Sequence, residues 1–278
     1  MPRLNQLLYL IVCAASALQS AAAEENVAPL PRGHAHNDYR HKRPLLDALD
    51  HGFCSVEADI FLIDGKLLVG HDLFDLRPSR TLEKLYLDPL RKRALANGGR
   101  IHRNGPSVML LIDIKRDGAK AYARLSEVLA EYKEILSSVE DGKFHSRAVQ
   151  VVISGDRPRE AIAADSIRYA AIDGRLGDLD SPAPAHLVPL ISDRWSSHFR
   201  WRGAGPFPPD EKRKLVSIVN RAHASGRRVR FWATPENPLL WRELLAADVD
   251  HINTDQLSKL RDHLLNQPPR PPRSKSQQ

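Results

Sequence analysis

The feature that most constrains the fold is a regular alternation of short apolar, β-rich runs with stretches of helical spacing. The β-rich runs lie at residues 28–33, 55–63, 108–114, 148–154, 168–172, 187–192, 228–233 and 251–254. Helix-like stretches separate most of them, at residues 44–51, 81–96, 119–136, 158–164, 210–225, 238–247 and 255–266. Strands that alternate with helices are typical of a parallel α/β architecture. About eight such units predict a closed (β/α)8 TIM barrel in a single domain, rather than an open sheet.

Two local signals refine this prediction. The Asp64-Gly65 pair stands between the run at 55–63 and a further short run at 66–69, and a DG pair in that position predicts a β-hairpin. No GxGxxG or P-loop pattern follows any of the runs, which weakens a nucleotide-binding open sheet as the alternative. No repeat of solenoid or propeller period is present either.

The N-terminus has the pattern of a targeting segment. Arg3 supplies a short positive region, residues 7–18 are apolar, and Ala21-Ala22-Ala23 precedes Glu24. This pattern predicts a signal peptide at residues 1–23 and an exported protein, either periplasmic or secreted. The catalytic barrel domain would then span residues 24–267, and the Pro- and Arg-rich residues 268–278 are predicted to be a disordered tail.

The cysteine content limits the disulfides that the exported chain could form. Removal of Cys13 with the signal would leave only Cys54, so no internal disulfide could form. Cys54 is interpreted as a small buried core residue.

The net charge of +7 comes from scattered Lys and Arg without any nucleic-acid-binding motif, so we expect no nucleic-acid partner. The charge favours either an anionic substrate, with peripheral contact to an anionic membrane surface, or a simple solvated surface. We expect a monomer.

Paired carboxylates in the second β-rich run indicate a metal site. Glu57 and Asp59 are two residues apart on a strand and therefore point to the same side, while the apolar Val56, Ala58 and Ile60 point to the other. Two interior carboxylates repel each other unless a cation or a proton lies between them. Mg²⁺ or Ca²⁺, one per chain, would satisfy them because both ions prefer oxygen ligands. The alternative is an exposed acidic edge strand.

Asp113, in the apolar run MLLIDIK, is another carboxylate on a strand that we expect to be buried. A buried carboxylate without a partner is costly, so Asp113 at the end of its strand is a candidate third metal ligand. Lys115 would face the same way, and a plain Asp–Lys ion pair at the barrel rim is the alternative.

Three histidines, His34, His36 and His71, each come at or after the end of a predicted strand. In a barrel the carboxyl ends of the strands form the catalytic face. A metal ion together with a histidine base and a histidine acid is suited to cleaving a phosphodiester, because the ion neutralises oxygens while the histidines transfer protons.

These residues resemble the phospholipase-C-like phosphodiesterase superfamily, which includes glycerophosphodiester phosphodiesterases and sphingomyelinase D toxins. The opening HxHNDY is most similar to the branch named for altered inheritance of mitochondria protein 6. The matching motifs are Gly33-His34-Ala35-His36-Asn37, Gly52 to Asp59, His71-Asp72, Asp113-Ile114-Lys115 and Phe231-Trp232. The resemblance implies a metal-dependent phosphoric diester hydrolase, or a lyase that forms a cyclic phosphate, acting on a glycerophosphodiester or a phospholipid-like diester.

The resemblance also implies roles for individual residues. It makes Glu57, Asp59 and Asp113 the metal ligands, and His34 and His71 the acid–base pair. Four further residues are expected to contact the substrate: Lys115, Trp232, Asn37 and His36. For Trp232, ordinary core packing is the alternative.

The sequence departs from the family pattern in ways that leave the substrate open. Ala35 follows His34 where glycerophosphodiesterases have an HRG motif, and their PENT motif is missing. Two other functions therefore stay as alternatives. The His34-Ala35-His36 HxH would suit a binuclear zinc hydrolase, although the later strand ends offer Asp173 and Asp193 rather than histidine. The second alternative is a barrel that binds a phosphate-containing ligand without catalysing a reaction.

The loops at 72–79 and 192–209 are expected to line the mouth of the barrel. The second contains four aromatic residues, which either meet a lipid chain or a sugar, or pack against the barrel: Trp195, Phe199, Trp201 and Phe207.

Overall fold

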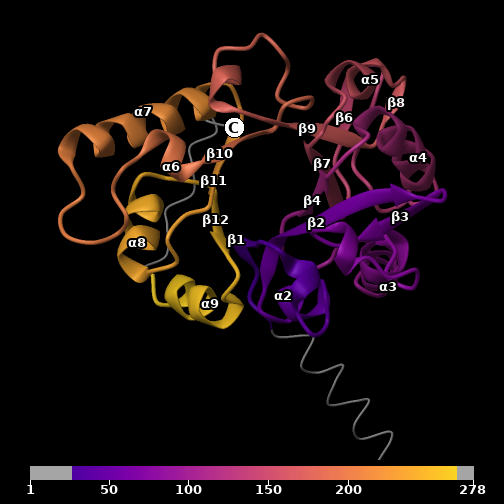
Figure 1. Ribbon diagram of the computed structural model, residues 1–278, viewed down its shortest axis with the longest axis horizontal. Coiled ribbons are helices and arrows are strands. Elements are labelled where there is room, and N and C mark those ends of the chain that lie inside the picture. Colours follow the sequence, from indigo (N-terminus) through magenta and orange to yellow (C-terminus); the bar gives the residue numbers. More distant parts are fainter. Residues whose placement is uncertain (1–26, 268–278) are drawn as a thin grey trace, which may run out of the picture.

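The computed structural model describes residues 27–267, and its parallel strands close into a ring (Figure 1). The ring strands are β1 (Leu30–Ala35), β2 (Phe53–Ile63), β4 (Val108–Ile114), β7 (Val149–Gly155), β9 (Ala170–Gly174), β10 (Leu190–Arg194), β11 (Arg228–Trp232) and β12 (His251–Thr254). The sheet runs β1-β12-β11-β10-β9-β7-β4-β2, with the hairpin strand β3 (Lys66–Val69) at its end, and an additional pairing of β1 with β2 closes the ring. The predicted (β/α)8 barrel is confirmed.

Helices follow most of the strands and lie outside the ring, with α7, α8 and α9 on one side of Figure 1 and α3, α4 and α5 on the other. The helices are α2 (Leu46–Asp50), α3 (Asp88–Ala96), α4 (Gly118–Ala130), α5 (Arg159–Ala164), α6 (Trp195–His198), α7 (Pro209–Ala224), α8 (Pro238–Ala246) and α9 (Leu257–Leu265). In α7 the buried residues Leu215, Ile218, Val219 and Ala222 follow helical spacing, so this helix packs one apolar stripe on the barrel. Short 3-10 turns and one π-helical turn, η3 (Glu83–Leu87), complete the connections.

Side-chain alternation along the strands separates two cores. The outward residues Val56, Ala58 and Ile60 of β2 are fully buried in the layer between strands and helices. A second, smaller apolar cluster consists of inward-facing strand residues: Met109, Leu111, Val152, Ala171 and Leu190. Other buried strand residues are polar or charged, among them His34, Glu57 and Asp59, and these belong to the site described below.

The β2–β3 hairpin forms as predicted. Asp64 and Gly65 have φ values of 47° and 73°, which is the geometry of a tight two-residue hairpin turn. Ile60 pairs with Val69, and the backbone N–H of Gly70 donates to the carbonyl of Asp59 at 3.1 Å. The hairpin therefore returns the chain to the level of Asp59 just before His71.

Some predicted boundaries were wrong. The first strand was placed at residues 28–33 but is Leu30–Ala35, so His34 lies within β1 rather than after it. The helix expected at 119–136 ends at Ala130, and a small sheet of β5 (Ser138–Glu140), β6 (Lys143–His145) and β8 (Ile167–Arg168) was missed. Its hairpin turn is Asp141-Gly142, both with positive φ, a DG signal of the same kind as Asp64-Gly65.

The aromatic loop packs against the barrel. Trp195 is fully buried, stacks on Phe199 with ring centroids 4.1 Å apart and meets the outward-facing Phe231 edge-on at 5.4 Å. Trp201 stacks on Phe207 at 4.4 Å. Of the two alternatives for these rings, the structure has the packed one.

Cys54 is buried, as predicted. The predicted signal peptide, with Cys13, and the predicted tail at 268–278 lie outside the described residues. Within residues 27–267, no helix has the length and apolar character needed to cross a bilayer.

Candidate active site

Three carboxylates from two adjacent strands meet inside the barrel. Glu57 and Asp59 project inward from β2, and the register that pairs Asp59 with Asp113 brings the third acid from β4. One oxygen of each lies within 4.8 Å of the others. We call Glu57, Asp59 and Asp113 the acid cage. The sequence predicted that these three side chains would come together, and they do.

Two cations partly neutralise the acid cage. Arg230 of β11 donates to Glu57 Oε2 at 2.6 Å, with both side chains nearly fully buried. Lys115 Nζ lies 2.6 Å from Asp59 Oδ2 and 3.4 Å from Asp113 Oδ1. Burial opposes ionisation of Glu57, but the Arg230 charge and the His34 hydrogen bond outweigh it and hold the pKa of Glu57 well below its usual range.

The cage has the donors that a divalent ion requires. Asp59 Oδ1 is buried and has no hydrogen-bond partner, so one oxygen lacks the contact that a buried carboxylate needs. Burial, reinforced by the charges of Asp59 and Glu57, raises the pKa of Asp113 to about 6 against the opposing effect of Lys115. An oxygen-only donor set with surplus negative charge fits a hard ion such as Mg²⁺ or Ca²⁺.

His34 is fully buried at the floor of the cage. Burial, followed by the nearby Arg230 charge, lowers its pKa to about 3, so the ring is neutral. Its Nε2 lies 3.1 Å from Glu57 Oε2 and its Nδ1 lies 2.6 Å from Ser55 Oγ. A neutral ring has one N–H, so Nε2–H donates to the carboxylate and Nδ1 accepts from the serine hydroxyl.

His71 lies on the open side of the cage. Its Nδ1 is 2.9 Å from Asp59 Oδ2, and its side chain is 42% exposed. The Tyr39 hydroxyl lies 2.7 Å from Asp59 Oδ2, 2.7 Å from Asn37 Oδ1 and 3.2 Å from His71 Nδ1. Tyr39 thus ties the HNDY segment to the carboxylate that also holds His71.

His36 belongs to a separate pair at the rim. Its Nδ1 lies 2.7 Å from Asp255 Oδ1, just after β12, and Asn37 Nδ2 lies 3.3 Å from the same oxygen. Asp255 is in turn fixed because its backbone N–H donates to Glu236 at 2.7 Å. His36 and Asn37 therefore line the mouth beside the cage rather than joining it.

Trp232 ends β11 at the register of Arg194, whose guanidinium lies 5.5 Å from the centre of the indole ring. The indole is partly exposed, so it forms part of the mouth and does not pack in the core.

Several contributing residues were not predicted. Arg230 is one, although it stands two residues before Trp232 on the same strand and must face the same side. Tyr39, Ser55 and Asp255 are others: Tyr39 lies in the HxHNDY motif and Ser55 within the Gly52 to Asp59 motif, whereas Asp255 lies in none of the quoted motifs. Asn253 completes the set by accepting from Arg230 Nε at 2.9 Å.

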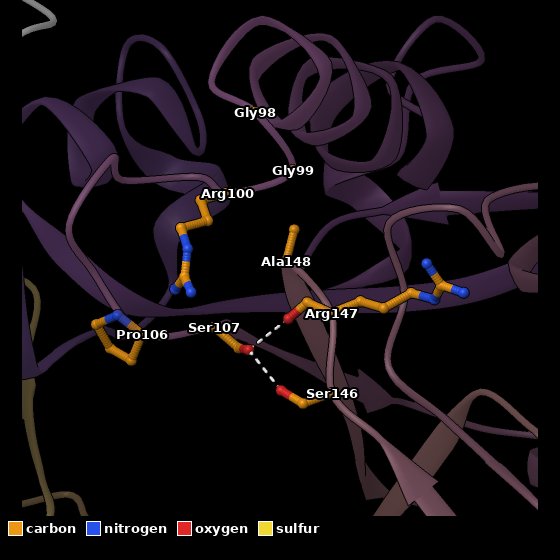
Figure 2. Close-up of a pocket in the computed structure, with 8 residues that line it drawn as sticks. All are labelled: Gly98, Gly99, Arg100, Pro106, Ser107, Ser146, Arg147 and Ala148. Atoms are coloured by element: carbon orange, nitrogen blue, oxygen red, sulfur yellow. Dashed lines mark hydrogen bonds between the residues drawn. The ribbon is translucent and has the colours of Figure 1, made fainter.

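Pockets in the described part of the chain lie away from the acid cage. One of about 250 Å³ lies where β4 and β7 begin, lined by Gly98, Gly99, Arg100, Pro106, Ser107, Ser146, Arg147 and Ala148 (Figure 2). Ser107 hydrogen-bonds the Arg147 carbonyl there. The acid cage lies toward the other end of the same strands, and no predicted site residue lines this pocket.

Comparison with known proteins agrees with this geometry. A family model described as an AIM6-like phosphodiesterase domain matches residues 21–173, more than half of the chain. Altered inheritance of mitochondria protein 6 of Eremothecium gossypii is 32% identical over 279 residues, covering 86% of this chain and 71% of that protein. The chain belongs to the AIM6-like phosphodiesterase family. A second model, described as the glycerophosphoryl diester phosphodiesterase family, matches residues 228–258.

Two solved structures share the barrel with this AIM6-like chain. A glycerophosphodiester phosphodiesterase from Parabacteroides distasonis has a TM-score of 0.54 at 16% identity and covers 84% of this chain and 96% of its own. A calcium-dependent phosphoinositol-specific phospholipase C from a Pseudomonas species has a TM-score of 0.53 at 11% identity, covering 85% and 93%. The two family models, together with this shared barrel, confirm the resemblance to the phospholipase-C-like superfamily.

Proposed function

We propose that this AIM6-like chain is a metal-dependent phosphodiesterase. The single observation that carries the proposal is the acid cage with His71 on its open side, in a chain whose family is a phosphodiesterase family. The substrate class is a phosphodiester, with a glycerophosphodiester or a phospholipid-like diester as the candidates.

Glu57, Asp59 and Asp113 would hold one Mg²⁺ or Ca²⁺. A bound ion supplies charge neutralisation to the phosphate oxygens. Lys115 is assigned to a phosphate oxygen because its Nζ already lies at the mouth of the cage, 2.6 Å from Asp59 Oδ2. Arg230 keeps Glu57 ionised and oriented, and the Tyr39 hydroxyl orients the Asp59 carboxylate by donating a hydrogen bond to it.

The two histidines are assigned the proton transfers. Donation from His71 Nδ1–H to Asp59 leaves Nε2 on the exposed part of the ring as the base. His34 is fully buried, so any proton that it transfers must pass at Nε2, beside Glu57 Oε2. The base removes a proton from water or from a neighbouring substrate hydroxyl, and the acid must be in its imidazolium form when it protonates the leaving alkoxide and returns to the neutral ring.

The two alternatives have less support. Within residues 27–267, the cluster able to hold a metal contains carboxylates only and no histidine, which disfavours a binuclear zinc hydrolase. A binding protein without catalysis has no need of a solvent-accessible His71 on the acid cage.

Substitution of the cage acids tests the proposal. Glu57→Gln and Asp59→Asn should each reduce metal-dependent cleavage of a model diester at least about a hundredfold and weaken Mg²⁺ binding measured by calorimetry. The matched control is Asp117→Asn, an exposed carboxylate beyond the end of β4 that pairs with Arg116 and should change neither quantity. Near-normal turnover in either cage variant would refute the metal assignment.

We also propose peripheral contact with an anionic membrane. Leu73 is 48% exposed and Phe74 92% exposed, two and three residues after His71, and basic side chains follow at Arg77 and Arg80. Phe74→Ser should reduce sedimentation with vesicles of anionic lipid at least about threefold, without changing cleavage of a soluble diester. Unchanged sedimentation would refute the contact.

Export is proposed from the N-terminal pattern of residues 1–23. N-terminal sequencing of the protein from its native host should begin at Glu24, and an intact Met1 would refute cleavage.

A further inference from the structure

An arginine without a carboxylate partner lies beside the acid cage. Arg157 follows β7, and its Nη1 donates to the carbonyl of Gly155 at 2.9 Å. Its Nε is buried without a hydrogen-bond partner, and among residues 27–267 no carboxylate lies within 4.0 Å of its guanidinium. Burial and the nearby Arg175 lower the pKa of Arg157. Asp173 and Asp178 lie near enough to favour its charge, but neither forms an ion pair with it, so among the described residues the guanidinium has no direct anionic contact to compensate its burial.

Arg175, at the end of β9, is paired with one carboxylate. Its Nη1 donates to Asp173 Oδ2 at 2.7 Å, and the same carboxylate accepts from the neutral hydroxyls of Ser154 and Ser192, each at 2.7 Å. Arg175 Nη2 donates to Ser154 Oγ at 3.3 Å. Asp173 balances the charge of one guanidinium group only, so Arg157 and Arg175 together leave an excess of positive charge between β7 and β9.

A third arginine, Arg194, extends this group along the next strand, and we call Arg157, Arg175 and Arg194 the arginine arc. Arg194 ends β10, is exposed, and lies over Trp232. No carboxylate in the described part of the chain forms an ion pair with its side chain. The arc thus runs along three consecutive ring strands, β7, β9 and β10, and ends at the predicted wall of the substrate pocket.

The arc begins directly against the acid cage. Asp113 pairs with Ser154 in the β4–β7 register, and a Cβ on Gly155 would lie 2.4 Å from Asp113 Oδ1. Neighbouring strands are about 4.8 Å apart, so the Arg175 position is roughly 10 Å across the mouth from β4. A chain of a few atoms can span that distance.

We propose that Arg157, Arg175 and Arg194 bind a second phosphate group, a phosphate monoester, on the substrate whose diester lies at the acid cage. The inference rests on the proposed phosphodiesterase function and narrows its substrate class to diesters with an additional phosphate. Guanidinium groups match phosphate oxygens in paired hydrogen bonds. Lys115 binds the phosphate of the diester, and the arginine arc binds the phosphate of the monoester.

Two synthetic diesters test the inference. Both are p-nitrophenyl phosphodiesters of propane-1,3-diol, and they differ only in whether the second hydroxyl is free or phosphorylated. With saturating Mg²⁺, kcat/KM of the wild-type protein should favour the phosphorylated diester by about tenfold or more. A preference of less than about twofold would overturn the inference while leaving the proposed function intact.

Arg157→Gln should lower that preference at least about fivefold, and Arg194→Gln should lower it in the same direction. The matched control is Arg221→Gln, which removes an exposed positive charge on α7 that pairs with Asp180 and should leave the preference unchanged. An unchanged preference in both Arg157→Gln and Arg194→Gln would also overturn the inference.

A binding measurement separates this inference from the catalytic proposal. The phosphate monoester of propane-1,3-diol is titrated into protein in EDTA and followed by calorimetry. Arg157→Gln should weaken its binding at least about fivefold, and equal affinity in wild type and variant would overturn the inference. Failure of the wild type to cleave either diester with Mg²⁺ or Ca²⁺ would overturn the proposed function, and the titration would then decide the arginine site alone.

Discussion

At the scale of single residues, buried charges in this barrel are held in pairs or small networks. Glu57 accepts from Arg230 at 2.6 Å and from His34 at 3.1 Å. Arg230 is also held by Asn253. Each charge is thus compensated by hydrogen bonds inside a low-dielectric interior, where removal of one partner leaves the other uncompensated.

Arg230→Met should therefore destabilise the protein by about 3–5 kcal/mol, because it leaves the Glu57 carboxylate buried without its cation. The double variant Glu57→Gln/Arg230→Met should recover part of this loss. Urea unfolding of the three proteins gives the free energies. Equal stability of Arg230→Met and wild type would show that the pair does not contribute.

Asp38 makes stability depend on pH. Burial raises its pKa to about 7, despite hydrogen bonds from Leu45 N–H and the Tyr86 hydroxyl. An acid whose pKa is higher in the folded state contributes stability at low pH that is lost as pH rises from about 4 to about 7. Asp38→Asn keeps the neutral shape, so its stability relative to wild type should increase between pH 5 and pH 8. Parallel pH dependence of the two proteins in urea unfolding would contradict this.

At the scale of elements, tight turns bring the functional groups into position. The β2–β3 hairpin returns His71 to Asp59, twelve residues earlier in the chain. At the end of β7, Gly155 has a φ of 69° and lies against the Asp113 carboxylate, so this position requires both a left-handed backbone and the absence of a side chain.

Gly155→Ala should therefore displace Asp113 and weaken Mg²⁺ binding at least about tenfold. Gly142→Ala is the matched control, since Gly142 has a φ of 71° but nothing within 4 Å of its Cβ position. Gly142→Ala should lose about 1 kcal/mol from backbone strain. Gly155→Ala should lose more, because its Cβ would also meet the Ile114 carbonyl oxygen at 2.3 Å, and only Gly155→Ala should lose metal affinity in calorimetry. Equal metal affinity in the two variants would contradict the role of Gly155.

At the scale of the whole molecule, closure of the ring assembles the site. The pairings of β1 with β12 and β2 join the first and last strands of the ring. Arg230 thereby reaches Glu57 across 173 residues of sequence. A site built from strands so far apart exists only in the folded state, so a ligand of the acid cage must stabilise the fold.

Mg²⁺ or Ca²⁺ should accordingly raise the Tm, by a stabilisation of about 2.7 kcal/mol at a concentration one hundred times the Kd. EDTA should reverse the shift, and Asp59→Asn should abolish it. Differential scanning calorimetry with each ion measures the effect and ranks the two ions. An identical shift in Asp59→Asn would locate the metal elsewhere.

Strand alternation and strand-end position, read from the sequence, were enough to predict the barrel, the inward pair Glu57 and Asp59, and the approach of Asp113. These features are local, because side-chain direction on a strand has a period of two and parallel strands end at one face. The missed sheet of β5, β6 and β8 was also within reach, since Asp141-Gly142 is a local turn signal.

Only the tertiary structure decided which groups meet across the ring. Arg230 was not singled out among the residues of its strand, and only the family resemblance gave His34 and His36 different roles. Ring closure pairs Arg230 with Glu57 and separates the two histidines. His34 is buried against Glu57 and His36 faces Asp255 at the rim. Burial and long-range pairing set the charge state and the exposure of these groups, and neither follows from the order of residues along a single strand.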